Sequence, residues 1–126
     1  MAAHINRALA AASQERQQAE FDAIVAIGCD AAPELGAHLG DNRELPVPYL
    51  RLENRSPQAF EAFRQYGPET VTDAVAAILN HLTGQHFGFI YNGGTDEERS
   101  SSVTAWKNYL RETPSGEVCR SVAPSV

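Results

Sequence analysis

Four histidines are the residues of this chain best suited to proton transfer or metal binding. His81 and His86 flank Gly84 at the expected end of a helix, whereas His4 and His38 lie far away in the sequence. None of these spacings matches HExxH or a comparable metal-binding pattern. We therefore expect no catalytic residue, no metal and no cofactor. A small enzyme or metal-binding protein that uses the His81/His86 loop region is the alternative.

Serines and glycines add little to this chemistry. Residues 100–102 are three serines at the start of an expected helix, and the chain has no GxSxG elbow. Asn92-Gly93-Gly94 precedes the same helix and could hold an anion through backbone N–H groups. Three acidic residues at 96–98 already crowd that helix end with negative charge. The glycines are therefore interpreted as a turn, and the chain as a non-enzyme.

The two cysteines, Cys29 and Cys119, are far apart and form no CxxC motif. We expect two buried thiols, since a free cysteine packs like a small hydrophobic residue. The alternative is a disulfide between Cys29 and Cys119, which would tie the C-terminal tail to the first helical pair. Such a bond would imply an oxidising compartment.

Composition restricts the class of protein. The 126 residues allow one domain, with 43% hydrophobic and 21% charged residues, as in ordinary globular proteins. A net charge of -6 argues against nucleic acid or an anionic membrane as the partner. No apolar run is long enough to span a membrane, and the N-terminus has no hydrophobic leader. We expect a cytoplasmic protein, or a periplasmic one if a signal peptide has been removed.

Hydrophobic periodicity predicts the elements that would position these residues: a compact all-α bundle of about five helices. Residues 1–27 are expected to be helical, with a weak apolar stripe at 13–18 where the helix breaks or is solvated. A short helix capped by Asp30 should follow, with Leu35 and Leu39 pointing inward. Ser56-Pro57 should then open a short helix that carries Phe60 and Phe63.

The second half of the chain gives the clearest helical signals. Apolar residues of the helix after Pro68 fall on one face, and Gly84 ends that helix; these residues are Val71, Ala74, Val75, Ile78, Leu79 and Leu82. Thr95 and Glu98 form a capping box for the last helix, in which Trp106 belongs to the buried stripe. We expect a single domain over residues 1–113 and a C-terminal tail over 114–126.

Residues 41–55 form the long connection, with an extended segment at 49–53 between polar stretches. Long loops in small domains are often functional, although packed surface loops are common. Five exposed residues are our candidates for a binding surface: Asp41, Arg43, Tyr49, Arg51 and Glu53.

Two stretches resemble uncharacterised bacterial HEAT-like proteins, which are helical-repeat scaffolds. The first comprises residues 23–28, 31–35 and 39–41, with an Ala-Pro turn between two helices. The second comprises residues 77–88, 95–99 and 105–107, with the pattern L-T-G-x-x-F-G, then E-E-R, then W-K. The resemblance covers somewhat over half the chain and implies HEAT-like antiparallel helix pairs and protein binding. The chain is shorter than a normal solenoid, which needs at least about three repeats.

These observations together favour a non-catalytic helical protein-interaction domain. An inhibitor or immunity-type partner of another bacterial protein would fit the acidity, the resemblance and the lack of catalytic motifs. Its partner would be another protein rather than nucleic acid or membrane. A further alternative is a structural fragment, either the cap of a larger helical assembly or a homodimer.

Overall fold

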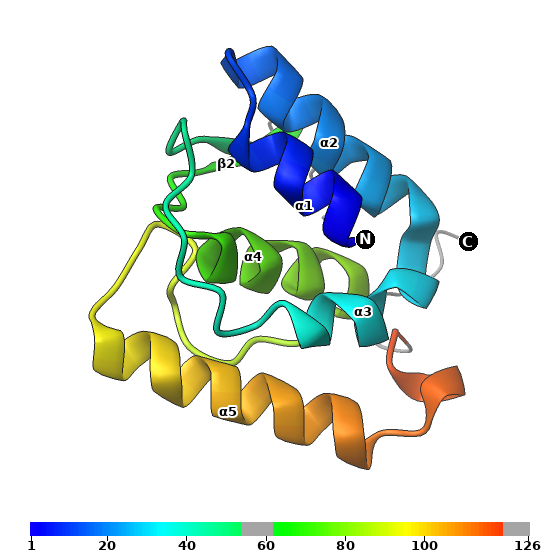
Figure 1. The fold of residues 1–126 in the computed structure, drawn as a ribbon. Helices are drawn as coiled ribbons and strands as arrows, with labels where there is room; N and C mark the ends of the chain where they lie inside the picture. Colours follow the sequence, from blue (N-terminus) through cyan, green and yellow to red (C-terminus); the bar gives the residue numbers. More distant parts are fainter. Residues whose placement is uncertain (54–61, 120–126) are drawn as a thin grey trace.

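The computed structural model describes residues 1–53 and 62–119, which form helices packed around a central helix and a small sheet (Figure 1). Helices α1 (Ala2–Leu9) and α2 (Gln14–Ile27) lead through the 3₁₀ turn η1 (Gly28–Ala31) into α3 (Ala32–Ala37). Strands β1 (Leu50–Glu53) and β2 (Phe63–Tyr66) follow, and then α4 (Val71–Thr83), α5 (Asp96–Glu112) and the 3₁₀ turn η2 (Ser115–Glu117).

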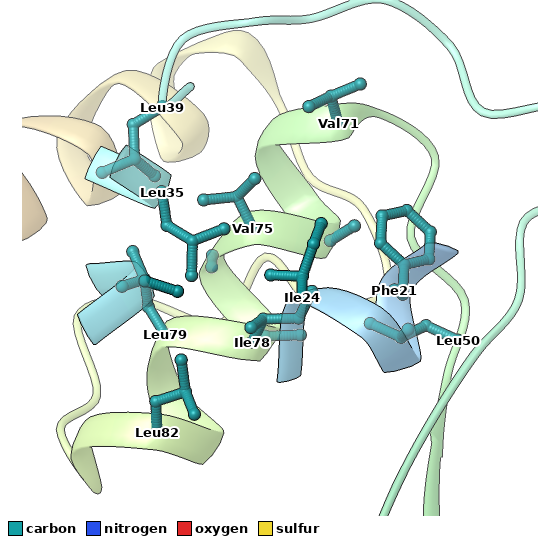
Figure 2. Close-up of a cluster of buried hydrophobic side chains, with 14 of the residues drawn as sticks. Phe21, Ile24, Leu35, Leu39, Leu50, Val71, Val75, Ile78, Leu79 and Leu82 are labelled. Atoms are coloured by element: carbon teal, nitrogen blue, oxygen red, sulfur yellow. The ribbon is translucent and has the colours of Figure 1, made fainter. Parts of the chain in front are cut away.

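Helix α4 is the centre of the fold. Eleven of its thirteen residues are buried, because α1 and α2 cover one side of it while α3 and α5 lie on others (Figure 1). Its expected apolar face is confirmed: all six predicted positions are buried. Figure 2 shows these side chains against Phe21 and Ile24 of α2, Leu35 and Leu39, and Leu50 of β1.

Local signals explain where the helices begin and end. The helix does break, but at residues 10–13 rather than through the weak stripe at 13–18, since residues 14–18 belong to α2. Ser13 caps α2 by accepting a hydrogen bond from the Arg16 N–H. Thr70 and Thr95 each head a complete capping box, so the Thr95 prediction is confirmed. Gly84 ends α4 in the left-handed conformation that glycine adopts without strain. Asp30 caps nothing; it lies within η1.

The prediction of an all-α bundle is wrong, because β1 and β2 form an antiparallel sheet that pairs Leu50 with Tyr66 and Glu53 with Phe63. Phe63 is expected in a short helix, but it begins β2. Ser56-Pro57 and Phe60, the first part of that expected helix, lie outside the described residues. Strand β1 alternates buried and exposed residues, the pattern of a strand with one covered face.

Two buried glutamines of α2 hold the free side of β1. The Gln17 amide donates to the Val47 and Tyr49 carbonyls, at 2.8 and 3.2 Å, and accepts from the Val47 N–H. The Gln18 amide both donates to the Arg51 carbonyl and accepts from its N–H, each at 2.8 Å. These side chains replace a third strand, so the outer edge of β1 is satisfied by a helix.

The expected HEAT-like pairing is also wrong. After η1, α3 packs chiefly on α4 and α5 instead of forming an antiparallel pair with α2. The antiparallel pair of the N-terminal region is α1 with α2 (Figure 1). The sheet then separates this pair from α4 and α5 along the chain, and no repeated unit appears among the described residues.

Cys29 and Cys119 are joined in a disulfide with 6.1 Å between their Cα atoms. The expectation of two free thiols is therefore wrong, and the alternative of a covalent link is correct. Val118 is buried beside this bond, and its carbonyl accepts a 2.6 Å hydrogen bond from the Tyr109 hydroxyl. Within the expected tail, Val118 and Cys119 are thus anchored to the domain, whereas residues 114–117 are exposed.

Candidate functional site

The surface residues predicted from the 41–55 connection fall into two groups. Asp41 and Arg43 form one group: their side chains pair at 2.6 Å, and Arg43 also approaches Asn6 of α1. The hydrogen bonds from Arg43 keep the pKa of the Asp41 carboxyl below its usual value. The Asp41 carbonyl accepts hydrogen bonds from the Thr72 hydroxyl and N–H, both at 2.9 Å. This pair therefore helps to fix the chain at the start of α4.

The second group belongs to the hairpin. Arg51 and Glu53 point outward from β1, and the Arg51 guanidinium lies 4.8 Å from the centre of the Phe63 ring. Tyr49 is half-buried, and its carbonyl is one of the Gln17 acceptors. Phe63 is 45% exposed, so this face combines one aromatic ring with charges of both signs. It is a mixed polar surface.

The two histidines of the alternative hypothesis have different surroundings. His81 is half-buried on α4, whereas His86 is exposed on the following loop and its Nδ1 lies 2.7 Å from the Tyr91 hydroxyl. Burial raises the pKa of Tyr91 to about 12, so its phenol stays neutral near pH 7. Among residues 1–53 and 62–119, no group of three or more His, Cys, Asp or Glu side chains is placed to bind a metal.

The loop between α4 and α5 carries a cluster of rings. Tyr91 is buried and contacts Tyr66 of β2, His86 and Phe89, with ring centres 5.2 to 5.6 Å apart. Phe89 itself is 65% exposed, more than any other large hydrophobic side chain among the described residues. The buried Tyr91 thus supports a ring that is exposed to solvent.

Phe89 borders an open pocket of about 600 Å³ between this loop and the first half of α5. The loop side of the pocket is formed by the apolar side chains Phe87, Phe89 and Ile90. The helix side is polar, with Glu97, Glu98 and Ser101. An apolar wall facing a carboxylate wall can hold an amphipathic group.

Several contacts hold the loop wall of the pocket against α5. The Phe87 ring packs on the fully buried Trp106 of α5, with ring centres 4.8 Å apart. Ser102 donates a hydrogen bond to the Phe87 carbonyl, so this serine holds the loop. Gly88 has a φ of 92°, which favours glycine, and a Cβ there would lie 3.4 Å from Ser102. The loop therefore lies close against α5.

Electrostatics at the pocket are dominated by the acidic first turn of α5. The hydrogen bonds from Thr95 lower the pKa of Glu98, which keeps its carboxylate ionised. Arg99, the neighbouring cation, turns to the other side: its guanidinium binds both carboxylate oxygens of the buried Asp73, at 2.8 and 3.0 Å, and Glu69 at 3.1 Å. Its charge is thus already neutralised by other carboxylates.

The Asn92-Gly93-Gly94 segment is used internally. The Asn92 side chain accepts a 2.7 Å hydrogen bond from the Gly67 N–H, and the Glu69 carboxylate occupies the space where a Gly93 side chain would lie. The Glu69 carboxylate thus lies where an anion would approach Gly93. This agrees with the interpretation of the glycines as a turn rather than an anion site.

Phe89 and the pocket were not among the candidates predicted from the sequence, which in this region were limited to His81 and His86. The available signal was an aromatic residue on each side of Gly88, ahead of the acidic helix start at 96–98. No family model, curated protein or solved structure matches this chain. In the described part of the chain, no helix is both long and apolar enough to cross a membrane.

Proposed function

We propose that this protein is a non-catalytic binding domain that contacts a partner protein through the pocket between the 84–95 loop and α5. The observation that carries this proposal is Phe89, 65% exposed at the border of an open pocket with a polar far wall. Burying such a ring in an interface is worth roughly 1.5–3 kcal/mol. Aromatic residues are enriched in protein interfaces for this reason.

The groups nearest to catalytic chemistry support the same proposal, because they bind other parts of the chain. The Ser102 hydroxyl donates to the Phe87 carbonyl, while His86 faces Tyr91. A serine nucleophile needs a base within hydrogen-bond reach. In this arrangement the serine fixes the loop against α5, and the histidine belongs to the ring cluster.

The disulfide favours an oxidising compartment over the cytoplasm. Disulfides persist outside the reducing cytosol of most cells, and Cys29–Cys119 joins segments 90 residues apart. We therefore propose that the protein works in the periplasm or outside the cell. The measurement is the redox state of the two cysteines in cells, trapped by alkylation before lysis; free thiols would support the cytoplasmic assignment.

The experiment compares partner capture by the purified protein and by single variants at three exposed positions. The baits are the wild type, Phe89→Ser, Arg51→Ala and Ile27→Ser, with captured proteins from the source organism quantified by mass spectrometry. Ile27 is 48% exposed and is the matched control for loss of an exposed apolar side chain. We expect one stoichiometric partner that Phe89→Ser alone loses. Loss with Arg51→Ala instead would assign binding to the hairpin, and equal capture by all baits would contradict the proposal.

A further inference from the structure

We infer that the pocket beside Phe89 receives a positively charged side chain, arginine or lysine, carried by an otherwise apolar segment of the partner. This inference rests on the proposed function, since it assumes that the pocket is the binding surface. It goes further by naming the chemical group that the pocket selects.

Charge is the first argument. The pocket lining contains two carboxylates, Glu97 and Glu98, and no Lys, Arg or His. Asp96 lies next to them in the same exposed first turn. A helix N-terminus carries only about +0.5 charge, so these three carboxylates outweigh the dipole, and the local field attracts cations.

The capping box is the second argument. Thr95 accepts from the Glu98 N–H at 3.1 Å, and the Glu98 side chain accepts from the Thr95 N–H at 2.8 Å. These two N–H groups are bound within the chain and are therefore less available to an anion. The charged side chains of this exposed turn are all carboxylates.

The apolar wall provides the third argument. An arginine or lysine has a long aliphatic stem below its charged head, so it can lie along apolar side chains while the head reaches carboxylates. Phe87 on the loop side and Ala105 of α5 offer such a surface, above the buried Ile90. The exposed Phe89 ring adds a cation–π contact, worth about 0.5–1 kcal/mol at an exposed site.

The partner segment can also be described. Its cation should be flanked by apolar residues, because the Phe89 ring that lines the pocket is 65% exposed and leaves apolar surface for neighbouring side chains to cover. The net charge of -6 would speed the approach of a basic partner at low salt. Binding should therefore weaken as ionic strength rises.

The experiment titrates the ¹⁵N-labelled protein with blocked pentapeptides and follows amide chemical shifts. The probe is acetyl-Ala-Leu-Arg-Leu-Ala-amide, and the matched controls replace arginine by citrulline, which keeps its shape without charge, or by glutamate. We expect the arginine peptide to shift the amides of residues 87–90 and 97–105. The citrulline peptide should bind about tenfold more weakly, from loss of the ion pair and the cation–π contact.

Protein variants separate a local contact from a general charge effect. Glu97→Gln and Glu112→Gln remove the same charge from opposite ends of α5, and both side chains are exposed. We expect Glu97→Gln to weaken the arginine peptide about threefold, and Glu112→Gln to leave it unchanged. Phe89→Leu, which keeps an apolar side chain but removes the ring, should weaken it about threefold.

The outcomes distinguish the inference from the proposed function. Equal binding of the arginine and citrulline peptides, preference for glutamate, or no shift with any peptide would overturn the inference. The proposed function would stand in each case if Phe89→Ser still abolished partner capture. If capture is insensitive to Phe89 and the pocket amides stay unshifted, both are wrong.

Discussion

Among single residues, Asp73 and Arg99 form a buried ion pair that joins the start of α4 to the start of α5. Asp73 is fully buried, accepts from the Glu69 and Thr70 N–H groups, and binds the Arg99 guanidinium. Arg99 is itself only 12% exposed, so losing Asp73 leaves a poorly hydrated cation paired only with the exposed Glu69, and leaves the Glu69 and Thr70 N–H groups without this acceptor. The same arginine sits one residue after the acidic pocket turn. This pair therefore links stability to the geometry of the site.

We predict that Asp73→Ala lowers the free energy of unfolding by about 3–5 kcal/mol, the usual cost of breaking a buried pair from one side. Urea denaturation followed by circular dichroism measures this change. Asp96→Ala, at an exposed first-turn carboxylate of α5, is the control and should cost less than about 1 kcal/mol. A similar small loss in both variants would show that the Asp73–Arg99 pair contributes little.

Tyr91 provides a pH-dependent prediction at the same scale. Its pKa is raised to about 12 by burial, against about 10 for an exposed phenol. The unfolded chain therefore loses this proton first, and stability should decrease between about pH 10 and 12 by at most about 1.4 kcal/mol per pH unit. Below pH 10 the contribution is complete. Urea unfolding of the wild type and Tyr91→Phe across this range measures it.

The comparison depends on slopes and not on absolute stabilities. Tyr91→Phe also removes the hydrogen bond with His86, which shifts the whole curve without changing its slope near pH 11. Burial also raises the pKa of Tyr109, so part of the wild-type slope should remain in the variant. Parallel curves for the two proteins would contradict a raised Tyr91 pKa.

Elements differ in how clearly the sequence specifies them. Helix α4 was predictable because its apolar residues recur at helical spacing between a capping threonine and Gly84. Strand β2 was not, since Phe60 and Phe63 stand three apart, as on a helix face. Four residues are too few for a clear period-two pattern, and the partner strand begins at Leu50. A short strand paired at a distance carries little local information.

At the scale of elements, Gln17 and Gln18 of α2 hold the edge of the hairpin, a role that no local sequence pattern indicates. Gln17 is fully buried, and its amide serves three backbone groups about 30 residues away. In sequence it lies in the weak stretch where the helix was expected to break or be solvated. Its partners lie about 30 residues away and come close only in the folded chain. The neighbouring sequence therefore indicated an exposed, hydrated glutamine.

We predict that Gln17→Ala destabilises the fold by about 2–3 kcal/mol, since it leaves buried backbone groups without hydrogen bonds. Gln14→Ala, at an exposed position at the start of the same helix, is the control and should change stability by less than about 0.5 kcal/mol. Hydrogen exchange should locate the effect: the Val47 amide, which donates to Gln17, should lose protection, whereas the Arg51 amide, which donates to Gln18, should lose less. Unchanged protection at Val47 would mean that Gln17 does not hold the chain that leads into β1.

The candidate site shows the same division between local and distant information. The capping box and the buried Trp106 were predictable from neighbouring residues. The exposure of Phe89 was not, because it depends on Tyr91 and Ile90 being buried while the ring between them and Gly88 is left outside. The 41–55 connection was predicted to be a binding surface because of its length. In the structure, the Val47 carbonyl is bound by α2 and the Asp41 carbonyl by α4.

At the scale of the whole molecule, the disulfide joins the N-terminal half to the end of the described chain. Closing a loop of 90 residues restricts the unfolded state, and we predict that Cys29→Ser with Cys119→Ser lowers stability by about 2–4 kcal/mol. Segment 114–119 should also detach, because residue 119 is then no longer bonded to residue 29; limited trypsin digestion near Arg111 reports this. The oxidised wild type is the control, and reduction should reproduce the double variant. Equal stability and equal cleavage in all three samples would show that side-chain packing alone holds the segment in place.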